Sequence, residues 1–111
     1  IDWVALDGYN WGCDREWSAW QSFEEIFTAA YNTMTALSRC PIMIGEMAST
    51  GTGGSKALWI TEALHVIETK FPRIQALIWF DVHKECDWRI DSSFESLEAF
   101  RSGVKLINRP D

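Results

Sequence analysis

Three short apolar runs alternate along the chain with three longer segments whose apolar residues recur every three or four positions. The runs cover residues 3–7, 41–46 and 74–80. Nearly continuous apolar runs of this length are typical of strands in a parallel sheet whose two faces are both covered. The longer segments each carry one apolar face, which is typical of amphipathic helices. The order predicts an α/β fold of parallel (β/α) units, arranged as a barrel or as a doubly wound sheet.

Serine residues mark the expected starts of all three helices. Ser22 is followed three positions later by Glu25, the spacing of a capping box. Ser55 begins the second helix after a glycine-rich loop, and Pro72 ends it. Ser92 and Glu95 have the same spacing as the first pair and predict a second capping box at the third helix.

Polar and aromatic side chains gather where the expected strands end. In a parallel (β/α) array these ends lie on one face. That face would bring together Asp7, Tyr9, Asn10, Glu46, Trp79 and Asp81. Carboxylates beside an indole fit sugar recognition and carboxylate-driven chemistry. The strand pattern alone leaves two interpretations of Glu46 open, a catalytic group or a solvated residue at a strand end.

The composition of the chain limits the kinds of molecule that it can bind. The 111 residues are 47% hydrophobic and carry a net charge of -6, which argues against nucleic acid or an anionic membrane as a partner. The apolar runs are far shorter than a membrane span. Seven tryptophans are more than core packing requires, and indole faces are the usual surface for stacking sugar rings. Trp11, Trp17, Trp79 and Trp88 fall at strand ends or in loops and are the candidates for such contacts.

No cofactor or metal is expected. The three cysteines form no C-x-x-C pair. Cys13 and Cys86 both follow strands and form the one pair that topology would allow as a disulfide, although three free thiols fit equally well. His83, in a charged loop, fits a solvated position better than a metal or sugar contact. The glycine-rich segment 51–56 lacks the spacing of a phosphate-binding loop, and no strand is followed by a dinucleotide-binding motif.

Four stretches together resemble the C-terminal part of glycoside hydrolase family 26, which includes β-mannanases and mixed-linkage β-glucanases. They are residues 3–12 (WVALDGYNWG), 41–49 (PIMIGEMAS), 78–81 (IWFD) and 87–93 (DWRIDSS). The resemblance implies that residues 1–111 form the last three units, strands six to eight, of a single catalytic (β/α)8 barrel. It also implies a secreted protein that acts on β-1,4-mannan or β-1,3-1,4-glucan.

The resemblance implies roles for individual residues. Glu46 matches the nucleophile of a retaining mechanism, Tyr9 the tyrosine that hydrogen-bonds it, and Trp79 an indole that lines the cleaved sugar's subsite. The further candidates for substrate binding are Asp7, Asn10, Trp11, Asp81 and Trp88.

The general acid/base glutamate of the family belongs on the fourth strand, outside these 111 residues. The loop carboxylates Glu16, Asp81, Glu85 and Asp87 are weak substitutes for it, so we expect the segment alone not to turn over substrate. Two other readings stay open. One is a non-catalytic carbohydrate-binding remnant. The other is a fragment that must assemble with the remaining barrel strands or with another copy.

Overall fold

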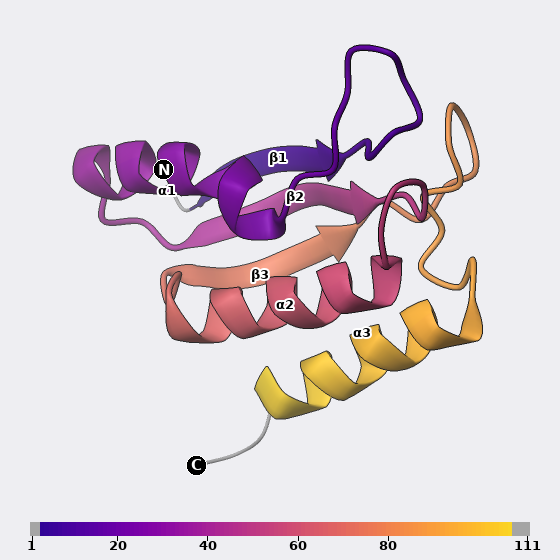
Figure 1. Ribbon diagram of the computed structural model, residues 1–111. Helices are drawn as coiled ribbons and strands as arrows, with labels where there is room; N and C mark the ends of the chain where they lie inside the picture. Colours follow the sequence, from indigo (N-terminus) through magenta and orange to yellow (C-terminus); the bar gives the residue numbers. More distant parts are fainter. Residues whose placement is uncertain (1–2, 108–111) are drawn as a thin grey trace.

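Three parallel strands and three helices alternate along the chain (Figure 1). The computed structural model describes residues 3–107, so residues 1–2 and 108–111 of the expected domain lie outside the described residues. The elements are β1 (Val4–Asn10), α1 (Phe23–Leu37), β2 (Ile42–Ser49), α2 (Lys56–Thr69), β3 (Ile74–Trp79) and α3 (Phe94–Ile107). The predicted order of parallel strands and helices is therefore confirmed.

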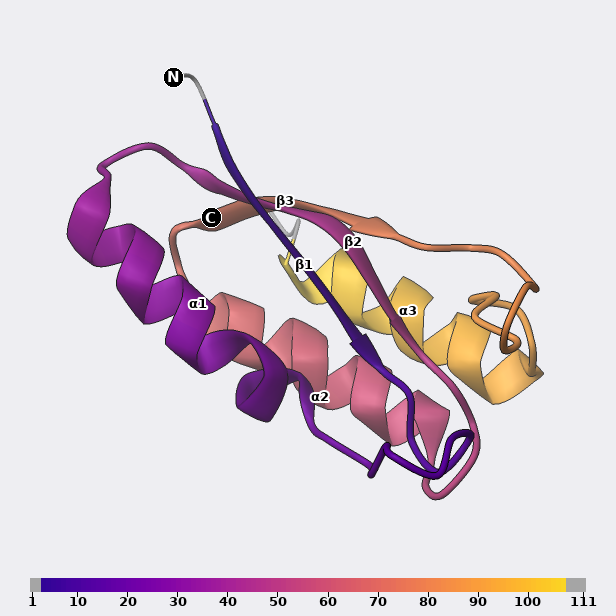
Figure 2. The same cartoon turned by 90° about the horizontal axis from the view of Figure 1, so that it is seen from above.

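The sheet follows the order of the sequence, β1-β2-β3. Because crossovers between parallel strands are right-handed, an order without reversal places the connecting helices on the same face of the sheet. Figure 2 shows the three helices side by side in sequence order. Val4 and Leu6 of β1 pack toward the helices, whereas Trp3 is 45% exposed and Ile78 of β3 is 53% exposed. The sheet therefore has one covered and one open face, not the two covered faces expected.

The core lies between the sheet and the helices. Helix α2 contributes most to it, and its predicted apolar face is confirmed: Trp59, Ile60, Ala63, Leu64 and Ile67 are all buried. The indole of Trp59 also donates a hydrogen bond of 2.7 Å to the carbonyl of Gln21, which secures the polar end of that buried side chain. In α1 the buried residues are Phe23, Phe27 and Tyr31, while Leu37 at the end of the helix is 76% exposed.

Serine caps begin the helices, with one difference from expectation. The capping box of Ser22 and Glu25 is present, and Ser55 caps α2 through the amide of Leu58. At α3 the hydroxyl of Ser93 accepts from the amide of Ser96 at 3.1 Å. The prediction that Ser92 and Glu95 form the box is wrong, because the Ser92 hydroxyl is instead bound by Lys56.

Both β1 and β2 extend three residues beyond their predicted ends. The ladder continues through Tyr9 opposite Ala48 and Asn10 opposite Ser49. Tyr9 and Glu46 therefore lie inside strands, where backbone pairing fixes them, and not in the turns that follow. Among the described residues, no helix is long and apolar enough to cross a membrane.

Candidate active site

A β-bulge sets the position of Glu46. The register between β1 and β2 slips after Leu6, so that Leu6 pairs with Ile44 and Asp7 pairs with Glu46, with Gly45 as the extra residue. Bulges of this kind turn a side chain toward a site. A Cβ on Gly45 would lie 2.8 Å from Oδ1 of Asp7, so glycine leaves room for that carboxylate. The bulge therefore places Asp7 and Glu46 next to each other at the open face.

Tyr9 holds the Glu46 carboxylate. Its hydroxyl donates a hydrogen bond to Oε1 of Glu46, across the two strands. The phenol ring is itself fixed by an edge contact with Phe80, 5.6 Å between centroids, and by Trp88 at 5.4 Å. Since Oε1 is occupied by the phenol, Oε2 is the oxygen left for other chemistry. The pairing expected for Tyr9 and Glu46 is present in the structure.

Asn10 is structural in this arrangement. It is fully buried, its amide donates to the hydroxyl of Ser49 at 3.0 Å, and its carbonyl oxygen accepts from the backbone of Gly12 and Gln21. These bonds tie both ends of the loop between β1 and α1 to the end of the sheet. In this structure its polar atoms serve the fold, and the substrate-binding role expected for Asn10 stays a prediction.

Trp79 and Trp88 are both buried, at 9% and 1% exposure. The indole of Trp79 packs edge-on against Trp59 and Phe100 of the helices, and its Nε1 donates to the carbonyl of Trp88 at 2.7 Å. In this structure neither indole presents an open face to a sugar, because Trp79 turns toward the helices and Trp88 is covered. The platform role implied for Trp79 stays a prediction.

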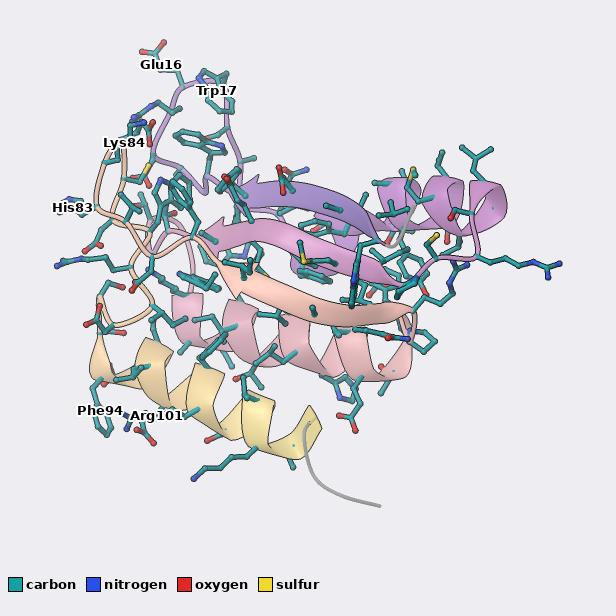
Figure 3. All side chains as sticks on the ribbon, turned by 180° about the vertical axis from the view of Figure 1, so that it is seen from behind. Glu16, Trp17, His83, Lys84, Phe94 and Arg101 are labelled. Carbon is teal, nitrogen blue, oxygen red and sulfur yellow. The ribbon has the colours of Figure 1, made fainter. Side chains whose placement is uncertain are left out.

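Trp11 and Trp17 form the accessible part of the aromatic group. Trp11 is half-buried, with Trp88 at 4.9 Å and Trp17 at 5.3 Å between ring centroids. Trp17 is 71% exposed and lies near Glu16 in the loop after β1 (Figure 3). A row of rings thus runs from this loop through Trp88 to Tyr9.

A buried lysine ties the loop after β3 to the start of α2. Lys56, the first residue of α2, is 6% exposed. Its ammonium donates to the carbonyls of Asp87 and Arg89 at 3.2 and 2.7 Å and to the hydroxyl of Ser92 at 2.8 Å. These contacts fasten the segment 82–92, which follows β3, to the start of α2.

Three carboxylates of the loop after β3 hold the same segment, and two of them, Glu85 and Asp87, are poor general acids. Asp81 accepts from the amide of Ile90 at 2.8 Å. The side-chain hydrogen bonds from Arg89 lower the pKa of Asp87 to about 2, and Arg89 also forms an ion pair with it at 2.8 Å. A hydrogen bond from its own backbone and another from Trp88 lower the pKa of Glu85. A group that must carry a proton at neutral pH needs a raised pKa, so neither Asp87 nor Glu85 fits.

His83 and Lys84 point outward from the loop after β3, away from the strands (Figure 3). Within residues 3–107, no group of three or more His, Cys, Asp or Glu side chains could hold a metal ion. Cys13 is exposed and Cys86 is buried, and no disulfide joins them in the described part of the chain.

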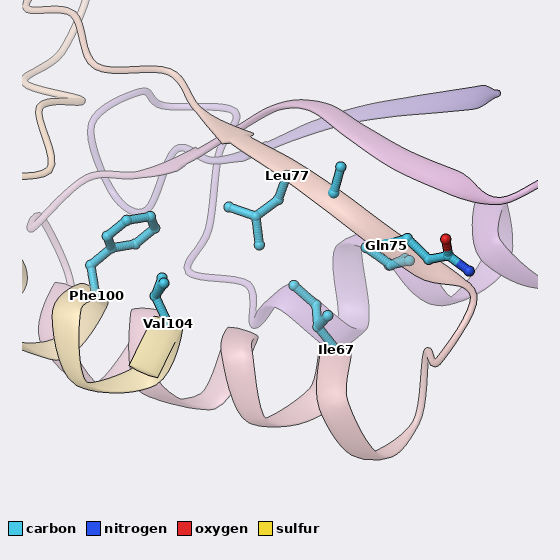
Figure 4. Close-up of a pocket in the computed structure, with 7 residues that line it drawn as sticks. Ile67, Gln75, Leu77, Phe100 and Val104 are labelled. Carbon is cyan, nitrogen blue, oxygen red and sulfur yellow. The ribbon is translucent and has the colours of Figure 1, made fainter. Parts of the chain in front are cut away.

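An apolar groove of about 270 Å³ lies away from Glu46, beside the edge strand β3 (Figure 4). It is lined by Ile67, Ile74, Gln75, Ala76, Leu77, Phe100 and Val104. The groove contains no ionisable side chain, so its lining suits packing by another apolar element more than chemistry.

Two positions in this site carry no strong signal in the sequence. Lys56 follows a glycine-rich loop and suggests a phosphate-binding loop that the spacing then excludes, so its role in anchoring a distant segment is visible only in the fold. Gly45 precedes Glu46 inside an apolar run, and a glycine within a strand pattern is the one local hint of a bulge.

Comparison with known proteins finds a sequence similar to nearly the whole of this chain. The chain is 46% identical over 105 residues to a stretch of a protein named Endoglucanase H from Acetivibrio thermocellus. The alignment covers 94% of this chain but 12% of that protein, so the chain spans a small part of the relative it matches. No family model matches the sequence. The chain is therefore related to part of a glycoside hydrolase, without assignment to a particular family.

Proposed function

We propose that this chain forms part of a retaining β-glycoside hydrolase in which Glu46 is the nucleophile. The observation that carries the proposal is the hydrogen bond from Tyr9 to Oε1 of Glu46, at a bulge on the open face of the sheet. The sequence identity with part of a protein named as an endoglucanase supports the same class of chemistry.

In the proposed reaction, Oε2 of Glu46 attacks the anomeric carbon while the glycosidic oxygen takes a proton and leaves. A covalent glycosyl–enzyme intermediate forms, and a water molecule then displaces Glu46 with the anomeric configuration retained. The hydrogen bond from Tyr9 orients the carboxylate for attack. Glu46 needs no activation by a neighbouring base because a carboxylate is already a nucleophile.

A retaining glycosidase also needs a carboxylic acid about 5–5.5 Å from the nucleophile, first as an acid and then as a base. Asp81, Glu85 and Asp87 are engaged in holding their own loop. We therefore assign the acid/base to a residue outside these 111, as the resemblance to glycoside hydrolase family 26 implies.

We further propose that the three units are strands six to eight of a (β/α)8 barrel. A sheet in sequential order with one open face suits a barrel, whose strands run in order and whose helices all lie outside. Doubly wound sheets instead reverse their order and carry helices on both faces. The exposed Trp3 and Ile78, together with the groove beside β3, favour packing against the remaining barrel strands or another copy.

For the substrate we propose a plant cell-wall β-glycan, either β-1,4-mannan or β-1,3-1,4-glucan. The enzyme would cleave bonds in the interior of the polysaccharide. The name of the relative favours a glucan. Substrates of this kind are insoluble or very large polymers, which is consistent with a secreted enzyme.

The direct test is an assay of the protein expressed together with the sequence that flanks it in its gene. Mannan and mixed-linkage β-glucan are incubated with wild type, Glu46→Gln and, as a matched control, Glu68→Gln, whose carboxylate lies on the exposed side of α2. We expect Glu46→Gln to lose roughly a thousandfold or more in kcat because a carboxamide is not a nucleophile. The control should keep full activity.

Unchanged hydrolysis by Glu46→Gln would contradict the proposal. Retention of the wild type on insoluble mannan or glucan without release of reducing sugar would instead support a carbohydrate-binding remnant.

A further inference from the structure

Within residues 3–107, no carboxylate lies within hydrogen-bond distance of the Lys56 ammonium, although Lys56 is buried. Its three donors go to two backbone carbonyls and one hydroxyl, all between residues 87 and 92. The ring of Trp79 lies 5.9 Å from Nζ and adds a cation–π contact. Burying a lysine has a high cost unless its donors are satisfied, and here all three are.

The two carbonyls bound by Lys56 lie on either side of Trp88. The carbonyl of Trp88 itself accepts from Nε1 of Trp79 at 2.7 Å, so three consecutive carbonyls are fixed. Three neighbouring anchors of this kind leave the backbone at Trp88 little freedom to move. The indole of Trp88 is consequently held in one place.

That indole is in contact with the group that orients Glu46. Its ring centroid lies 5.4 Å from that of Tyr9, and the two ring planes are tilted by 50°. The Tyr9 hydroxyl then reaches Glu46. A continuous series of contacts therefore runs from Lys56 through Trp88 and Tyr9 to the carboxylate.

We propose that Lys56 is a positioning residue, which clamps the segment 87–92 so that Trp88 holds Tyr9 against Glu46. The inference rests on the proposed function for its effect on hydrolysis, but the clamp itself can be tested without any substrate. Burial of the ammonium lowers the pKa of Lys56, and Asp81, Asp87, Arg89 and Asp91 are the charged groups that act on it.

The chain offers a specific spectroscopic probe, since it contains two tyrosines, Tyr9 and Tyr31. In the protein expressed with its flanking sequence, labelling with [13Cζ]tyrosine gives a resonance for each, which Tyr9→Phe and Tyr31→Phe assign. We expect Lys56→Met to shift or broaden the Tyr9 resonance and to speed amide exchange in segment 82–92. The Tyr31 resonance should stay in place because its hydroxyl contacts the amide of Arg73, in another part of the fold.

Lys70→Met is the matched control. Lys70 caps the other end of α2 and forms an exposed ion pair with Glu24 at 2.9 Å. We expect the Lys70→Met variant to shift neither tyrosine resonance. A folded Lys56→Met variant with an unchanged Tyr9 resonance and unchanged exchange would overturn the inference.

Ser92→Ala provides a second test of the clamp if Lys56→Met does not fold. It removes one of the three acceptors from an exposed position, so the helix and its core contacts remain. We expect a smaller displacement of the Tyr9 resonance in the same direction. A Ser92→Ala variant with no change in that resonance or in loop exchange would again contradict the clamp.

In the longer protein that hydrolyses substrate, Lys56→Met should lower kcat roughly 10–100-fold with little change in KM, because a displaced nucleophile affects the reaction more than binding. Lys56→Arg should restore part of the rate. If the wild type hydrolyses nothing, the proposed function fails, while the tyrosine resonances still decide whether the clamp exists.

Discussion

The hydroxyl of Tyr9 donates a hydrogen bond to the Glu46 carboxylate, although the two residues are 37 positions apart in the sequence. Parallel pairing of β1 with β2 brings them together, and the extra residue Gly45 turns Glu46 toward the same face as Asp7. The nucleophile proposed here therefore depends on a register shift between two strands as much as on its own identity.

Replacing Tyr9 with phenylalanine removes that hydrogen bond and keeps the ring contacts with Phe80 and Trp88. A hydrogen bond to a charged group contributes about 1.5–3 kcal/mol, so we expect kcat to fall roughly 10–150-fold in the hydrolytic protein. Steady-state kinetics on a soluble β-glycan measure the change.

The matched control for this variant is Tyr31→Phe, which removes a hydroxyl that contacts the amide of Arg73 on the far side of the core. It should lower the free energy of unfolding by about 1 kcal/mol and leave kcat unchanged. Equal loss of kcat in both variants would show that Tyr9 has no special relation to Glu46.

Gly8 lets α1 pack closely on β1. A Cβ at this position would lie 2.7 Å from Cζ of Phe27 and 2.8 Å from Cγ2 of Ile26. We expect Gly8→Ala to lower the free energy of unfolding by about 1–3 kcal/mol, since overpacking forces the helix away from the strand. Gly51→Ala, where no atom lies within 4 Å of the added Cβ, is the control and should be neutral. Urea titration compares the two, and equal stability of both variants would show that the contact is not as close as described.

The stability of the segment 82–92 depends on the ionisation of Asp87. Hydrogen bonds from Arg89 lower the pKa of Asp87 from 3.8 to about 2. A carboxyl group whose pKa is depressed by folding stabilises the native loop fully above its unfolded pKa, and this contribution is lost as the pH falls through the folded value. We therefore expect amide exchange in the segment to accelerate between about pH 4 and pH 2.

Asp87→Asn should remove that acid transition and leave the segment looser at neutral pH. Glu98→Gln, which removes an exposed ion pair with Arg101 on α3, should not alter the transition. An acid transition of unchanged size in Asp87→Asn would mean that another group controls the loop.

Cys86 should resist alkylation. It is 7% exposed. Burial, followed by a hydrogen bond with Asp14, raises the pKa of the Cys86 thiol to about 11. At pH 8 about one molecule in a thousand carries the reactive thiolate. Treatment with iodoacetamide followed by peptide mass mapping should modify exposed Cys13 and leave Cys86 intact until urea unfolds the chain. Reaction of both at the same rate in the native protein would contradict this burial.

Local patterns predicted the elements better than the arrangement of the site. The Ser22 capping box and the buried face of α2 follow from spacing alone, because both depend on residues within one or two turns. The bulge at Gly45 depends on how two strands pair, and the glycine within the apolar run is only a weak local hint of it.

The tryptophans show a second limit of reasoning from sequence. Trp79 and Trp88 fall at a strand end and in a loop, which favoured exposed positions. Packing against Trp59 and Phe100 instead buries Trp79, and packing against Tyr9 and Trp11 buries Trp88. Long-range contacts of this kind decide whether a loop residue serves binding or packing.

The most direct test of the central claim is covalent labelling of the nucleophile. The protein, expressed with its flanking sequence, is incubated with 2-deoxy-2-fluoro glucosides and mannosides that carry activated leaving groups, and its intact mass and peptides are measured. We expect one added sugar, located on Glu46 and lost in Glu46→Gln, with faster labelling by the sugar of the natural substrate. Turnover of a β-glycan together with an adduct on any other carboxylate would contradict it.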